Sequence, residues 1–149
     1  MRLIKIENLR GNDRILRGIN VVNGITFLGY EQRKFVLEAA NNDLNIIKNW
    51  FTKIGICYDS IEIVKNNIYY TVGGETLSLP DLSSGERFLL YLMAGKAINA
   101  NIVACGLFER LGGRLEAVAL REFRNYENLT VVIYNALLLK AQKYFYGGN

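Results

Sequence analysis

The stretch that decides the fold is LSSGERFLLYLMAGKAI, residues 82–98. Its sequence pattern predicts a helix from about residue 84 to residue 98. Ser83 or Ser84 can cap this helix, and Ser83 and Glu86 have the spacing of a capping box, in which the serine hydroxyl and the glutamate carboxylate each accept a backbone hydrogen bond. Gly85 in the first turn lets a ligand approach the backbone closely, and the unpaired amides at this positive end of the helix favour a phosphate. By itself, the stretch is typical of an ordinary capped helix.

Beyond this helix the chain alternates between apolar strands and helices. We expect strands at residues 102–104 and 129–134, a helix at about 114–124 between them, and a last helix that ends near Tyr144. Apolar strands joined by helices are typical of a parallel sheet covered on both faces. This half of the sequence therefore predicts an α/β fold.

Upstream of residue 82, the sequence predicts a more antiparallel arrangement. An opening strand is expected around Leu3, and the strand-like residues 15–28 are broken at the hairpin dipeptide Asn23-Gly24. Residues 32–54 follow a helical pattern with a break at 41–43.

A second hairpin is expected in the middle of the chain. Residues 60–64 and 68–72 are strand-like, flank Asn66-Asn67, and are closed by Gly73-Gly74.

Composition sets the class of protein and excludes several chemistries. With 149 residues, 50% of them hydrophobic, we expect one domain over residues 1–149. The chain has no histidine, which excludes a Ser-His-Asp triad, a histidine-ligated metal and a histidine general base. Because Cys57 and Cys105 are far apart, we expect buried thiols rather than a disulfide or a zinc site. The sequence contains neither a membrane span nor a signal peptide, so we expect a cytoplasmic protein.

The net charge of +4 is concentrated at the start of the chain. Residues 1–34 carry seven Lys and Arg against three Asp and Glu, so the other 115 residues are neutral. Such a segment is typical of contact with nucleic-acid phosphates, and equally of solvated surface cations. A mixed-charge, solvated helix face is expected farther along, at Arg114, Glu116, Arg121, Glu122 and Arg124.

The string LSSGER resembles the signature motif of ABC-type ATPases, in particular of the SMC-like and RecF-like heads of DNA-repair and chromosome proteins. The likeness extends over nearly the whole chain, in the family's order. Before the signature come the counterparts of the opening strand (MRLIKIENLR, 1–10), of the strand into the phosphate-binding loop (INVVNGITFLG, 19–29) and of the helix that leaves it (FVLEAA, 35–40). After it come NIVA (101–104), GLFERLGG (106–113) and LTVVIY (129–134).

This resemblance implies an α/β fold of the P-loop-NTPase type. The expected architecture is a mostly parallel sheet flanked by helices, with an antiparallel N-terminal β portion. Only 47 residues separate Lys34 from Leu82, so the helical subdomain must be much reduced and a coiled-coil arm is excluded.

Compared with the family, the phosphate-binding loop is degenerate. A working loop reads G-x-x-x-x-G-K-[ST]: its glycines let amides wrap the phosphates, its lysine reaches the β- and γ-phosphates, and its hydroxyl binds Mg²⁺. This chain reads GYEQRKF at residues 29–35, which lacks the second glycine and has Phe35 in place of the hydroxyl. What remains of the loop is Gly29, Arg33 and Lys34, and the glutamate between them should repel a triphosphate.

The acidic Walker B site, which holds Mg²⁺ and activates water in the family, is degenerate as well. The alignment places Cys105 at the metal-organising aspartate and Gly106 at the catalytic glutamate, and a shift of one residue gives Gly106 and Leu107 instead. Glu109 follows nearby but is displaced from the strand end. The family's histidine after the last strand has no counterpart, because the chain contains no histidine.

The resemblance therefore implies a pseudo-ATPase that binds no ATP or metal alone and does not hydrolyse ATP by itself. In the family, two heads face each other, and each ATP lies between the phosphate loop of one and the signature of the other. We expect a regulatory or assembly subunit that pairs with an intact ABC-type ATPase subunit, or with a second copy of itself. It would present Ser84 and Gly85 to ATP and Mg²⁺ shared with that partner. The complete signature is Leu82, Ser83, Ser84, Gly85 and Glu86.

Two alternatives stay open. In the first, the chain is a nucleic-acid-binding or scaffolding domain with a relic fold, in which the basic residues 2–34 contact phosphates and LSSGE only caps a helix. In the second, the unorthodox loop binds nucleotide after all. A gel shift with DNA at two salt concentrations tests the first alternative, and equilibrium dialysis with ATP and Mg²⁺ tests the second.

Overall fold

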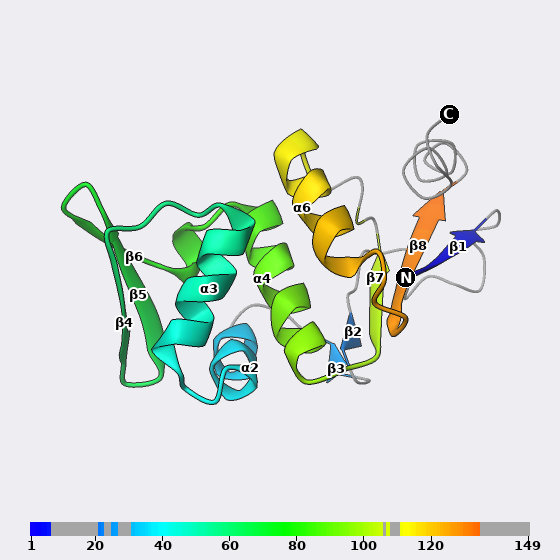
Figure 1. Ribbon diagram of the computed structural model, residues 1–149. Helices are drawn as coiled ribbons and strands as arrows, with labels where there is room; N and C mark the ends of the chain where they lie inside the picture. The colour runs from blue at the N-terminus through cyan, green and yellow to red at the C-terminus, as the bar shows by residue number, and fades with distance from the viewer. Residues whose placement is uncertain (7–20, 23–24, 27–30, 106, 108–110, 135–149) are drawn as a thin grey trace. The chain divides into compact units, whose positions relative to one another are not determined.

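The computed structural model of the chain describes residues 1–6, 21–22, 25–26, 31–105, 107 and 111–134 (Figure 1). The chain forms two compact units: the first combines Met1–Phe27 with Asn99–Asn149, and the second is the continuous segment Leu28–Ile98. Helices accompany parallel strands in the first unit and an antiparallel sheet in the second, so the predicted α/β class is confirmed. The last helix expected near Tyr144 lies outside the described residues, and one domain over the whole chain stays a prediction.

The first unit is built on a five-stranded sheet in the order β1-β8-β7-β2-β3. Its elements are β1 (Arg2–Ile6), β2 (Val21–Val22), β3 (Ile25–Thr26), β7 (Ile102–Cys105), helix α6 (Gly113–Phe123) and β8 (Leu129–Tyr134). β8 is parallel to both β1 and β7, with Arg2 opposite Thr130 and Ile102 opposite Leu129. β2 is antiparallel to both β7 and β3, so β3 runs in the direction of the parallel strands.

The apolar strands of this sheet are buried as their sequences predict. In β7, Ile102 and Ala104 are buried, and in β8 the three residues Leu129, Val131 and Val132 are buried. The antiparallel portion predicted near the N-terminus corresponds to the β2–β3 hairpin, whose strands lie on either side of Asn23-Gly24. The predicted β7, β8 and α6 thus occur, with bounds that differ by one residue at most for β7 and α6. Of the strand-like segment expected at 15–28, residues 15–20, 23–24 and 27–28 lie outside the described residues.

The second unit packs helices against a three-stranded antiparallel sheet. Its elements are α2 (Glu31–Ala39), α3 (Leu44–Ile54), β4 (Ser60–Val64), β5 (Asn67–Val72), β6 (Glu75–Ser78), the 3-10 helix η1 (Leu79–Asp81) and α4 (Ser84–Ala97). The predicted break between two helices is confirmed: Asn41 and Asn42 have φ values of 53° and 55°. Asp43 then caps α3, because its side chain accepts a hydrogen bond from the backbone N–H of Asn45 at 2.9 Å.

The predicted central hairpin is confirmed, with its turn one residue earlier than expected. Lys65 and Asn66 have φ values of 49° and 63°, and Asn67 is already the first residue of β5. Two successive residues with positive φ give the turn whose twist suits a two-residue hairpin. Gly73 and Gly74 repeat this arrangement, at φ values of 57° and 86°, and lead into β6, a third strand that the sequence does not predict.

Helix α4 forms the core of the second unit. Both α2 and α3 pack against it, and every residue from 88 to 95 is buried (Figure 1). Phe51 of α3 is fully buried and makes an edge-to-face contact with Tyr70 of β5, with ring centroids 5.6 Å apart. The helix that carries the LSSGE residues is therefore a core helix, and its first residues are placed by the packing of the whole unit.

Candidate functional site

The start of α4 holds the LSSGE motif in a fixed backbone conformation. Ser83 is the N-cap: its hydroxyl accepts a hydrogen bond from the N–H of Glu86 at 3.2 Å. In return, the Glu86 carboxylate accepts one from the N–H of Ser83 at 3.0 Å. The predicted capping box is confirmed. Leu82, which is 5% exposed, anchors the residue before the cap in the core.

The turn that precedes the motif is tied down in the same way. The Asp81 carboxylate accepts a hydrogen bond from the backbone N–H of Ser78 at 2.8 Å, which fixes the first turn of η1. The N–H of Leu82 then donates to the carbonyl of Leu79 at 3.1 Å. Local hydrogen bonds thus fix the backbone both before the LSSGE motif and within it. The conformation of the backbone that leads into α4 therefore does not depend on a ligand.

Exposure divides the motif into an outer and an inner part. Ser83 and Ser84 are exposed, whereas Gly85 is buried. Ser84 is the first residue of α4, and backbone N–H groups at this position find no partner within the helix. A molecule that approaches this helix end therefore meets the two serines and the positive end of the helix dipole.

Arg87 and Tyr91 lie one turn apart on α4, directly after the motif. The Nε atom of Arg87 is buried and makes no hydrogen bond within the described part of the chain. Burial raises the pKa of Tyr91 to about 12, against a smaller opposite effect of the Arg87 charge. Tyr91 is therefore a neutral packing residue at physiological pH and is unsuited to proton transfer.

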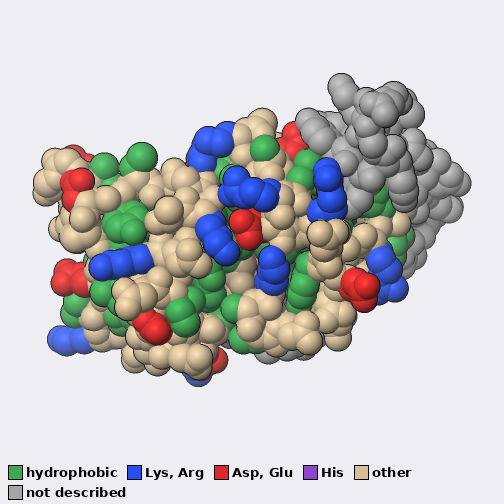
Figure 2. All heavy atoms as spheres, in the orientation of Figure 1, with side chains coloured by type: hydrophobic (Ala, Val, Ile, Leu, Met, Phe, Trp, Pro, Cys, Tyr) green, Lys and Arg blue, Asp and Glu red, His purple; other side chains and the backbone are tan. Residues whose placement is uncertain are grey.

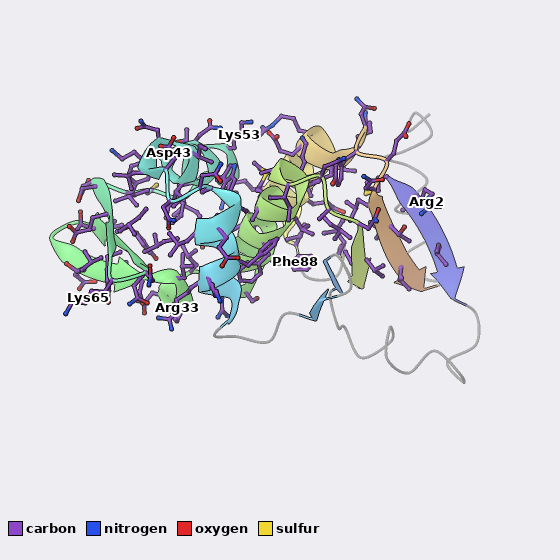
Figure 3. The ribbon with its side chains drawn as sticks, turned by 90° about the horizontal axis from the view of Figure 1, so that it is seen from below. Arg2, Arg33, Asp43, Lys53, Lys65 and Phe88 are labelled. Carbon is purple, nitrogen blue, oxygen red and sulfur yellow. The ribbon has the colours of Figure 1, made fainter. Side chains whose placement is uncertain are left out.

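Two residues that the sequence resemblance assigns to a degenerate phosphate-binding loop, Arg33 and Lys34, lie on α2. Arg33 donates from Nη1 to the Oδ1 atom of Asn67, at the start of β5 (Figure 3). Lys34 is largely exposed, and its Nζ lies 4.0 Å from the Glu38 carboxylate one turn along the helix. Gly29 lies outside the described residues. The Arg33 side chain is thus bound by a protein group, and the degenerate phosphate-binding loop stays a prediction.

Of the residues that the sequence resemblance assigns to a degenerate Walker B site, the structure describes Cys105, which is the last residue of β7. Gly106 and Glu109 lie outside the described residues. Within the part of the chain that the structure describes, no cluster of three or more Asp, Glu, Cys or His side chains has the arrangement of a metal site.

Two predictions about burial are wrong. Cys57 is exposed and is therefore not the buried thiol that the sequence predicts. Glu116 does not belong to the solvated face of α6, because its side chain is only 3% exposed. Arg114, Arg121 and Arg124 are exposed as expected, and Glu122 is half-buried. The spacing of the two residues could have predicted this burial. Two residues correspond to about 200° of rotation along a helix, so Glu116 and Arg114 lie on opposite sides of α6.

A comparison with models of known protein families finds no match to this chain, and neither does a comparison with curated protein sequences. Among the described helices, none combines the length and apolar character needed to cross a bilayer.

Proposed function

We propose that this protein is a non-catalytic subunit of ABC-ATPase type, which associates with an intact ATPase head and contributes its LSSGE motif to the partner's ATP site. The observation that carries the proposal is the start of α4. A capping box holds it in place, it leads directly into a buried core helix, and it leaves Ser83 and Ser84 exposed. This is the arrangement that a preformed phosphate contact requires, because the donors need no reorganisation when the ligand arrives.

The order of the elements supports a P-loop-NTPase-like fold for this subunit. β3 has the same direction as β7 and β8, and it is followed along the chain by helix α2. A strand that leads through a short segment into a helix, beside parallel strands, is the connection in which the family places its phosphate loop. The expected reduction of the helical subdomain also fits, since between α2 and α4 the chain forms only α3 and a small sheet.

The chain lacks residues that ATP hydrolysis needs, so we expect no hydrolysis by the chain alone. The chain lacks the glycine-lysine-hydroxyl loop, the carboxylate pair and the histidine. Arg33 and Lys34, the cations nearest to the loop, lie beside Asn67 and Glu38. Since each of these missing groups is worth orders of magnitude in rate in a working site, we expect ATP turnover only in the complex with the partner.

The experiment starts from the natural complex, recovered with the tagged full chain from its native host and identified by mass spectrometry. Ser84→Arg places a bulky side chain at the exposed start of α4, and we expect it to lower ATP hydrolysis by the complex at least about tenfold. Asn45→Arg is the matched control, because Asn45 is an exposed residue in the first turn of α3. Complexes with either variant should assemble equally.

Equal ATPase rates for the two variants would refute the role of the motif in trans. Recovery of a homodimer that has no ATPase partner and no ATP affinity in equilibrium dialysis would refute the proposed subunit as a whole.

A further inference from the structure

The burial of Glu116 leaves a row of arginines on the exposed side of α6. Arg114, Arg121 and Arg124 are separated by seven and three residues, spacings that return to the same side of a helix. The backbone of Arg124 is still helical, at φ −49° and ψ −44°. With a rise of 1.5 Å per residue, the row spans about 15 Å from its first to its last Cα atom. Figure 2 shows Lys and Arg side chains on the face that carries α6.

The N-terminus extends this row. The amino group of Met1 donates a hydrogen bond to the carbonyl of Arg124 at 3.2 Å, which places Arg2 next to the end of α6. Arg2 is exposed, and its Nη2 lies 3.4 Å from the hydroxyl of Thr130 on β8 (Figure 3). We call these four residues, Arg2, Arg114, Arg121 and Arg124, the arginine strip. All of them belong to the first unit.

The acidic residues described on α6 and in the turn after it are Glu116, Glu122 and Glu127. Among the described residues of α6 and the turn after it, Glu116 is buried, and Glu122 pairs with Arg121 at 3.4 Å with only 12% of its side chain exposed. Glu127 is exposed and raises the pKa of the Met1 amino group, although burial of that group has the larger, lowering effect.

The net positive charge of the chain is also concentrated in the first unit. The first unit contains eleven Lys and Arg against six Asp and Glu, a net charge of +5, whereas the second unit contains seven against eight, a net charge of −1. The basic segment 2–34 is divided between the two units, because Arg33 and Lys34 belong to the second. The excess of positive charge therefore belongs to the first unit as a whole, not to the N-terminal segment 2–34 alone.

Helix stability does not account for this arrangement. Arg121 and Arg124 lie near the C-terminus of α6, where the helix dipole favours cations, but Arg114 is the second residue of the helix. A cation at that end costs about 0.3–1 kcal/mol. Guanidinium groups bind phosphate through two parallel hydrogen bonds, and a row of them suits a phosphodiester chain.

We propose that the arginine strip binds the phosphate backbone of duplex DNA. Over about 15 Å, a duplex carries about nine phosphates on its two strands. Gly113, Ala117 and Asn125 are also exposed beside the strip, and they are small enough to let the backbone approach. None of these three is aromatic, so they offer no surface for stacking unpaired bases, and we expect a single strand to be the poorer ligand. Binding is independent of sequence, because only phosphates are contacted. The inference does not depend on the proposed ATPase partner.

The test measures fluorescence anisotropy of a labelled short duplex with the full chain, at salt concentrations between about 50 and 200 mM. The triple variant Arg114→Gln/Arg121→Gln/Arg124→Gln should bind at least tenfold more weakly. The slope of log affinity against log salt should become shallower by about 0.9 for each phosphate contact that is lost.

A control variant has the same net charge as the triple Arg→Gln variant. Lys53→Gln/Lys65→Gln/Lys96→Gln in the second unit also lowers the formal charge by three, from +4 to +1, and it should retain the affinity within about twofold. Circular dichroism checks that each variant is folded, and the conservative triple Arg→Lys variant should recover most of the binding. Equal weakening by both Gln triples would overturn the assignment of the strip. Tighter binding to single-stranded DNA, or to anionic lipid vesicles, than to the duplex would overturn it as well.

Discussion

Removal of the Ser83 hydroxyl tests whether the start of α4 is as firmly fixed as its hydrogen bonds indicate. In Ser83→Ala, the N–H of Glu86 loses its acceptor at 3.2 Å. The reciprocal bond, from the N–H of residue 83 to the Glu86 carboxylate at 3.0 Å, remains but is no longer supported by the serine hydroxyl bond. Replacing an N-cap serine with alanine costs about 1 kcal/mol, within a range of about 0.5–2 kcal/mol.

Because Ser83 is exposed, water can reach the freed N–H, and we expect a value near the middle of this range. About 1 kcal/mol lowers the folded-to-unfolded ratio about fivefold. The effect should appear in the second unit, since α4 forms its core.

The assay uses the natural fluorescence of Trp50, the single tryptophan of the chain. Trp50 is buried in α3, which packs against α4, so urea unfolding followed at this residue reports on the unit that contains the cap. Ser84→Ala is the matched control, because the Ser84 hydroxyl takes no part in the capping box, and it should change the free energy of unfolding by less than about 0.5 kcal/mol. Ser83→Asp should restore most of the loss, since aspartate is an equally good N-cap.

If Ser83→Ala and Ser84→Ala proved equally stable, or if Ser83→Asp failed to restore stability, the capping box would not be what holds this helix end. The motif would then need another physical origin.

Two further predictions concern the second unit. Burial raises the pKa of Tyr91 to about 12, above the ordinary value of 10.0, so its contribution to stability should be complete below pH 10 and be lost as the pH rises toward 12. Urea unfolding between pH 8 and about 11 should therefore show a shallower alkaline decline for Tyr91→Phe than for the natural chain, and an identical decline would contradict this origin. Gly74→Ala should destabilise the unit by about 1–2 kcal/mol, because a Cβ at φ 86° is strained although nothing lies within 4 Å of it. Gly74→Asn should cost clearly less by the same denaturation assay, and equal costs would point to a cause other than backbone strain.

Much of the fold could be predicted because local patterns and packing agree. The apolar runs that form β7, β8 and α4 have the length and composition of buried elements, and Asn-Asn-Asp at residues 41–43 marks a helix break by its preference for left-handed backbone. β6 was not predicted, because ETLS has neither apolar alternation nor β-branched residues beyond Thr76. It forms a strand because the Gly73-Gly74 turn folds it back onto β5.

The candidate site was predictable where its chemistry is local. The bond between Ser83 and Glu86 depends on residues three apart, so spacing alone is enough to predict it. The engagement of Arg33 with Asn67 joins residues 34 apart, and only tertiary structure brings them together. The error at Glu116 had a different source: charges were grouped by proximity in sequence, whereas rotation around α6 decides which side each one occupies.

The separation of β1 from β8 has a consequence for the order in which the chain is made. Arg2 on β1 pairs with Thr130 on β8, 128 residues later, whereas every strand and helix of the second unit lies within the continuous segment that ends at Ile98. During synthesis, the second unit therefore has all of its own elements before either β7 or β8 has been translated. During this interval β1 has no β8 strand to pair with, so its backbone donors and acceptors can bond to other chains. Slower synthesis between residues 98 and 134 should then lengthen the time in which β1 can pair with other chains.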